Sequence, residues 1–149
     1  MAQLNANNYQ LTQNAPSSQL PKGELNGRVK TMFDEITLAA ELAANDEINL
    51  YKLPAGARVI EAMIVSPSLG ATGILQLGHR ANAELAEDAD AFIASADAGG
   101  QAVKAQMPAG SAGLLKKFES ETQIYSKCTE LSAAGTGLTI KFLISYVVD

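Results

Sequence analysis

The sequence lacks tryptophan, has one cysteine and one histidine, and has aromatic residues at only 5% of its 149 positions. A lone cysteine, Cys128, excludes an internal disulfide, which is compatible with assembly in a reducing cytoplasm. One histidine and one cysteine cannot supply a zinc ligand set. His79 stands in Gly78-His79-Arg80, which resembles no nucleophile motif, and we expect it to pack on a strand or meet solvent. The absence of tryptophan and of a second cysteine also argues against an antibody-type domain.

Positive charge is not concentrated anywhere along the chain. The net charge is −5, and the 11 Lys and Arg residues are scattered, with only Lys116 and Lys117 adjacent. Proteins that bind phosphate backbones normally cluster their cations, so no direct contact with nucleic acid is expected. The longest strongly apolar stretch, residues 138–148, includes Lys141 and is too short to cross a bilayer, so no membrane partner is expected. No basic region followed by an apolar run marks a signal peptide.

The sequence contains few side chains that could act in catalysis or bind a metal or cofactor. Glu84, Glu87, Asp88 and Asp90 form an acidic cluster that lacks the glycine and final glutamate of a calcium loop. We interpret it as the solvated face of a short helix, so the sequence predicts no metal and no cofactor. The Gly-Gly and Gly-Thr-Gly segments are typical of tight turns, and neither forms a phosphate loop. These absences predict a protein that is not an enzyme, although a carboxylate pair on a β-sandwich remains an alternative.

The first 21 residues contain no charged side chain, and four of them are Asn and four are Gln. Such a segment cannot bury enough apolar area to offset the entropy of ordering it. It is therefore either a disordered tail or an extended arm, residues 1–27, that lies on a neighbouring subunit. We favour the arm, because an uncharged segment can add a strand to a neighbouring sheet without desolvating charge. Its expected anchors in apolar pockets are Leu4, Tyr9, Leu11 and Leu20.

From residue 28 to residue 149 the pattern is that of a β-domain. Residues 138–148 alternate between two faces over their whole length, a period that a helix cannot share. Residues 84–96 instead have apolar positions at helical spacing and predict one short helix. Gly, Pro, Asn and Ser mark the turns between about eight predicted strands, at residues 29–38, 47–53, 58–65, 73–80, 102–107, 114–119, 123–130 and 138–148. This pattern predicts an all-β antiparallel β-sandwich, for which we prefer a jelly roll because eight strands fill its two sheets.

One stretch resembles a known group of proteins. Residues 38–60 read LAAELAANDEINLYKLPAGARVI, and residues 73–78 form a glycine-bounded strand, GILQLG. Together, over roughly residues 31–80, they resemble small virion proteins of tailed bacteriophages, some of which are head decoration (cement) proteins. The resemblance implies a jelly roll or related sandwich, often a homotrimer, that coats the lattice of the major capsid protein. The shared Pro-Ala-Gly turn implies a structural role only, because Pro54 fixes φ and Gly56 permits a positive φ.

We therefore expect a non-enzymatic protein of the virion head surface. Its expected partner is the major capsid protein, bound through the arm and through contacts within a trimer. Two alternatives remain open: a tail or receptor-binding virion component and, in another class, the β-sandwich enzyme. A shell-forming capsid subunit is a further structural alternative, which the length of 149 residues disfavours. A receptor-binding module is expected to expose aromatic residues on its loops, and few occur here.

Overall fold

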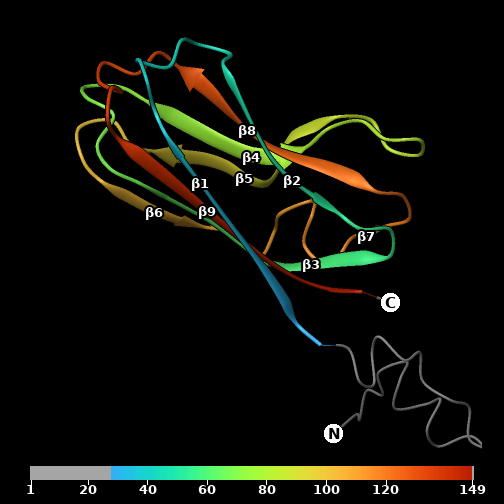
Figure 1. Ribbon diagram of the computed structural model, residues 1–149. Coiled ribbons are helices and arrows are strands. Elements are labelled where there is room, and N and C mark those ends of the chain that lie inside the picture. The colour runs from blue at the N-terminus through green and yellow to red at the C-terminus, as the bar shows by residue number, and fades with distance from the viewer. Residues whose placement is uncertain (1–27, 149) are drawn as a thin grey trace, which may run out of the picture.

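The computed structural model describes residues 28–148, which form two packed antiparallel sheets (Figure 1). The predicted antiparallel β-sandwich is therefore confirmed. The predicted arm, residues 1–27, lies outside the described residues together with Asp149, so the division into arm and domain stays a prediction. The nine strands of residues 28–148 are β1 (Lys30–Thr37), β2 (Glu47–Leu53), β3 (Ala57–Ser66), β4 (Ile74–His79), β5 (Asp88–Asp97), β6 (Val103–Gln106), β7 (Lys117–Phe118), β8 (Thr122–Glu130) and β9 (Thr139–Val148).

The strand order is that of a jelly roll. One sheet has the order β1-β9-β3-β6, with the short β7 also paired to β3, and the other has the order β2-β8-β4-β5. The pairs β1–β9, β2–β8, β3–β6 and β4–β5 are nested, each lying inside the previous one in sequence. The chain is thus a long antiparallel ribbon that is rolled up so that successive pairs fall in alternate sheets. We call the first the β1 sheet and the second the β2 sheet.

The core lies between the two sheets, and the alternating residues of β9 illustrate how it forms. Ile140, Phe142 and Ile144 point inward and are buried, whereas Lys141 between them is exposed. Apolar residues of β3 and β4 complete much of the same core, namely Val59, Ala62, Ile64, Leu75 and Leu77. The period of two in residues 138–148 therefore identified both the strand and its buried face correctly.

The predicted helix at residues 84–96 is wrong, because β5 (Asp88–Asp97) occupies this segment and residues 28–148 contain no helix. Pairing with β4 overrides the local preference, since the strand buries Ala91, Phe92 and Ile93 consecutively. Two register shifts in the β4–β5 ladder allow three adjacent residues to be buried. Gly78 permits the close approach of the strands, because a Cβ there would collide with the carbonyl oxygen of Asp88.

The other predicted strands are present, with one much shorter than expected. Of residues 114–119 only the two residues of β7 pair with β3. The preceding residues form turns, including one at Leu115, which has a φ of 58°. Residues 28–148 contain no helix that is long and apolar enough to cross a membrane.

Candidate partner-binding surfaces

His79, the only histidine, is fully buried in the core. Its Nδ1 lies 3.0 Å from the carbonyl oxygen of Arg80, and its ring packs edge-on against Phe118 and Phe92, with centroids 5.2 and 6.4 Å away. A carbonyl only accepts hydrogen bonds, so Nδ1 carries a proton and is the donor. Nε2 has no partner within residues 28–148. The side chain is a packing element, in agreement with the sequence analysis.

The thiol of Cys128 is also buried, on the inner face of β8. Burial raises the pKa of this thiol, and its Sγ donates a hydrogen bond to the carbonyl oxygen of Glu130 over 2.8 Å. The reactive form of cysteine is the thiolate, which this environment disfavours. Cys128 is therefore a small core residue.

The acidic cluster does not form the helix face that we predicted. The carboxylate of Glu84 accepts a hydrogen bond from Ser120, and that of Glu87 accepts one from Tyr125. Asp88 and Asp90 stay near each other on β5, and a hydrogen bond shared with the Asp88 carboxylate favours the protonated form of Asp90 and raises its pKa. No group of three or more metal-ligating side chains comes together among residues 28–148.

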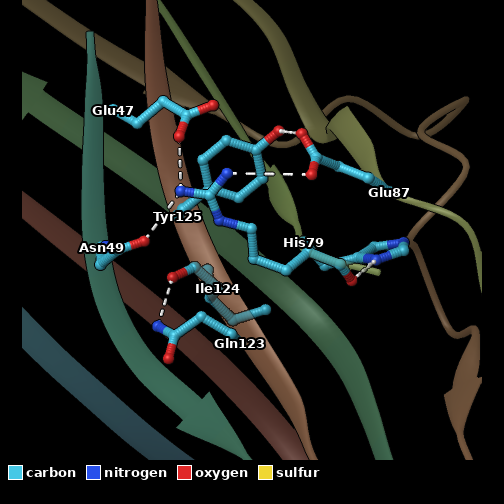
Figure 2. A network of polar contacts seen from close by, with 8 residues as sticks. Glu47, Asn49, His79, Glu87, Gln123, Ile124 and Tyr125 are labelled. Carbon is cyan, nitrogen blue, oxygen red and sulfur yellow. Dashed lines mark hydrogen bonds and ion pairs between the residues drawn. The ribbon is translucent and has the colours of Figure 1, made fainter. Parts of the chain in front are cut away.

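A polar network instead lies on the outer face of the β2 sheet (Figure 2). Arg80 makes most of its contacts. Nη2 of Arg80 donates to Glu47 Oε2 at 2.6 Å and to Asn49 Oδ1 at 3.0 Å, while Nη1 lies 3.8 Å from Glu87 Oε2. The guanidinium stacks on the ring of Tyr125, 3.9 Å from its centroid. The Tyr125 hydroxyl completes the network by donating to Glu87 Oε1 at 2.6 Å.

The network explains why an aromatic residue on the outer face of a sheet is buried. The side chain of Tyr125 points away from the core, because its neighbours Ile124 and Ser126 are the buried inner residues of β8. Burial is the main reason that the pKa of Tyr125 is raised, and the hydrogen bond to Glu87 adds to it. The hydrogen bond from Arg80 lowers the pKa of Glu47. The polar groups of the network bind one another, so they hold residues 80–87 on the sheet rather than forming a ligand site.

The outer face of the β1 sheet is different, because an apolar row crosses its middle. Phe33 of β1 pairs with Leu143 of β9, which pairs with Met63 of β3. None of the three belongs to the core cluster, and Phe33 is 59% exposed. A contiguous apolar row on the outer face of a sheet favours an interaction site. We call these three residues the apolar row.

A pocket of about 440 Å³ lies beside the apolar row, at one end of the β1 sheet. Its walls include Val65, Val103 and Pro67, and Lys104 and Lys141 stand at its sides. Within residues 28–148 neither lysine has an ion pair or hydrogen bond. Two unpaired cations beside an apolar floor favour a partner that offers a carboxylate.

The partner contacts predicted from the sequence involve other residues. The predicted anchors Leu4, Tyr9, Leu11 and Leu20 lie outside the described residues, and their contacts stay predictions. The apolar row was not predicted, although the sequence contains two signals of it. Met32 and Phe33 are adjacent large apolar residues on one strand, and Leu143 and Val147 occupy the face of β9 opposite to its buried residues.

The fold is similar to that of chains in phage capsid structures. A chain in the capsid of Ralstonia phage GP4 is 26% identical, with a TM-score of 0.69, over 82% of this chain and 85% of that one. A chain in the capsid asymmetric unit of cyanophage Pam1 is 18% identical, with a TM-score of 0.67, over 91% and 97%. One in the capsid of the Helicobacter pylori bacteriophage KHP30 is 14% identical, with a TM-score of 0.50, over 81% and 94%.

No protein-family profile and no curated protein matches the sequence. The likenesses to the Pam1 and KHP30 chains concern the fold alone. The likeness to the GP4 chain extends to sequence, supports a capsid-related structural role in a phage virion and argues against an enzyme.

Proposed function

We propose that this chain is a decoration (cement) protein that binds the outer surface of a phage head and stabilises the lattice of its major capsid protein. The observation that carries the proposal is the likeness to the GP4 capsid chain in both fold and sequence. The resemblance of residues 38–60 to small virion proteins is an independent observation that favours the same role.

Size supports a decoration role over that of the shell-forming subunit. The alignment with the GP4 chain covers similar shares of both chains, 82% and 85%, so the two are nearly equal in length. A single jelly roll of this size is small for a subunit that must enclose a genome. It is suited to binding a shell that other subunits have built.

A decoration protein must bridge neighbouring capsid subunits that internal pressure pushes apart. Several weak contacts on one molecule achieve this, because the first contact raises the effective concentration of the others. In the proposal the jelly roll supplies a rigid body and residues 1–27 supply an arm. The arm adds a strand to a neighbouring sheet and places Leu4, Tyr9, Leu11 and Leu20 in apolar pockets. A trimer would place three such arms around one lattice point.

The chemistry of the described residues is compatible with a purely structural role. The histidine and the cysteine are buried in the core. The cluster around Arg80 binds its own members. The single buried thiol also suits assembly in the host cytoplasm before the virion is released.

The test uses purified heads that lack this protein. Full-length chain is expected to bind them and to raise the temperature at which they disrupt. A variant without residues 1–21 is expected to keep the circular dichroism spectrum of the domain but to lose most of its occupancy. Undiminished occupancy of the truncated chain would exclude the arm, and binding of the full-length chain to tails but not to heads would refute the decoration role. Sedimentation at micromolar concentration tests the trimer, which a clean monomer would contradict.

A further inference from the structure

The two outer faces of the sandwich differ in how their polar groups are satisfied. On the β2 sheet the outer face is closed by the network of Arg80, and its large aromatic residue Tyr125 is buried. On the β1 sheet the outer face carries the exposed Phe33, the rest of the apolar row and the lysine pocket. Within residues 28–148, the outer face of the β1 sheet is therefore the face that nothing covers.

The strand register fixes which residues flank the apolar row. On one side, Glu35, Lys141, Val65 and Lys104 follow one another across β1, β9, β3 and β6. On the other side, Thr31, Ser145 and Glu61 follow one another across β1, β9 and β3. One flank thus has the two unpaired lysines around Val65. The other has Glu61, a carboxylate on the same strand as Val65 that has no partner among the described residues.

The apolar row and its charged flanks complement the same residues of a second copy. If two copies pack face to face about a two-fold axis along the apolar row, the axis exchanges the two flanks. Glu61 of each copy then lies over Val65 of the other, because both residues are on β3. Lys141 and Lys104 stand one strand away on either side, a spacing of about 4.8 Å that both side chains span. The three residues of the apolar row each meet their own counterparts, as an isologous interface requires.

We propose that the outer face of the β1 sheet binds the same face of a second copy of this chain, with Glu61 of each copy filling the lysine pocket of the other. The two sheets pack about 10 Å apart, as in other face-to-face sheet contacts. The interface closes the apolar row from water and pairs the pocket lysines of both copies with the two glutamates. The partner completes each pocket, which residues 28–148 of a single copy leave unfilled.

The proposed contact buries a small area, so the dimer that it forms is weak. Four strands about 4.8 Å apart and three rows about 7 Å apart cover a few hundred Å², less than the roughly 800 Å² per partner of a standard stable complex. The dimer is therefore weak in dilute solution and forms when copies are held close together. On a head this means neighbouring copies across a two-fold position, a consequence that rests on the proposed function. The contact itself is testable with the purified chain alone, so the two proposals fail separately.

Cross-linking tests the geometry. In Leu143→Cys the two introduced thiols face each other across the axis, and their Cα atoms, about 10 Å apart, suit a short bismaleimide but not a disulfide. Gln76→Cys is the matched control, because Gln76 is a half-buried outer residue on a middle strand of the β2 sheet. At millimolar concentration we expect on the order of tenfold more cross-linked dimer for Leu143→Cys than for Gln76→Cys, owing to the high effective concentration in a specific dimer. Equal yields would overturn the proposal.

Charge reversal tests the pairing. Glu61→Lys alone and the pair Lys104→Glu with Lys141→Glu should each reduce the yield from Leu143→Cys to that of the control. All three reversals together should restore it, because the carboxylates and the amines have only exchanged places. Each Lys→Glu change lowers the net charge by two and Glu61→Lys raises it by two, so the triple variant has a net charge of −7 against −5 for the native chain. Recovery therefore cannot come from reduced overall repulsion, and a triple variant as poor as the others would overturn the pairing.

The same variants show whether the chain is still folded and whether something other than a second copy covers the outer face of the β1 sheet. Each variant should keep the native circular dichroism spectrum, since all the changed residues are on outer faces. Another occupant would reveal itself if the thiol introduced by Leu143→Cys were protected from maleimide in a monomeric full-length chain. Loss of that protection on removal of residues 1–27 would identify the chain's own N-terminal segment as the covering. That outcome would overturn the proposal of a second copy.

Discussion

Replacing Arg80 with methionine tests whether the network on the β2 sheet stabilises the fold. Methionine keeps the apolar stem that covers the ring of Tyr125 but removes the charged fork. The cation–π contact at 3.9 Å is worth about 0.5 to 1 kcal/mol. The hydrogen bond to Asn49 adds roughly 0.5 kcal/mol, so Arg80→Met should cost at least about 1 kcal/mol. The ion pair with Glu47 adds little more, because solvent screens it.

The pH dependence of this loss has a defined sign. The hydrogen bond from Arg80 holds the pKa of Glu47 below its usual 4.5 in the folded chain. A lowered carboxyl pKa gives stability that is fully present above the unfolded pKa and is lost as the pH falls through the folded pKa. The stability difference between the native chain and Arg80→Met should therefore be full at pH 7 and should shrink modestly below pH 4.5.

Urea unfolding at pH 7 and at several lower pH values measures both effects. Arg80→Lys serves as the matched variant, because it keeps the charge but cannot hold Glu47 and Asn49 with one planar group. We expect it to lose about half as much stability as Arg80→Met. A loss below about 0.5 kcal/mol for Arg80→Met, or a loss that grows as the pH falls, would refute this account of the network.

Three further predictions concern single residues. Gly78→Ala should lower the free energy of unfolding in urea by more than about 2 kcal/mol, because the added Cβ would collide with the backbone of β5. Gly110→Ala is the control and should be nearly neutral, because a Cβ there meets open space. Cys128 should react with a thiol reagent only at the rate of unfolding, and fast labelling of the native chain would contradict its burial. Nitrogen NMR shifts should show a proton on Nδ1 of His79, and an unprotonated Nδ1 would disprove the hydrogen bond to the Arg80 carbonyl.

The fold could be predicted from sequence where one residue pattern decides the structure. The alternation of residues 138–148 identified β9 and its buried face, and turn residues such as Pro54 and Gly56 separated the strands. The prediction failed at residues 84–96, where apolar residues at helical spacing are buried by strand bulges. A bulge depends on pairing with β4, which no local pattern reveals.

The candidate surfaces were harder to predict, because they depend on which strands are neighbours. The contact of Arg80 with Glu47 and Tyr125 requires that β4, β8 and β2 lie side by side. Similarly, the apolar row forms only in the order β1-β9-β3. Long-range pairing of this kind does not follow from a single sequence. Spacing did predict a sandwich, and the preference for a jelly roll came from the number of strands.

A density map of the intact phage particle that carries this protein tests the decoration role most directly. We expect a jelly roll on the outer surface of the head, in contact with the major capsid protein. Density for this chain in the tail, or a complete head in which it is absent, would contradict the account.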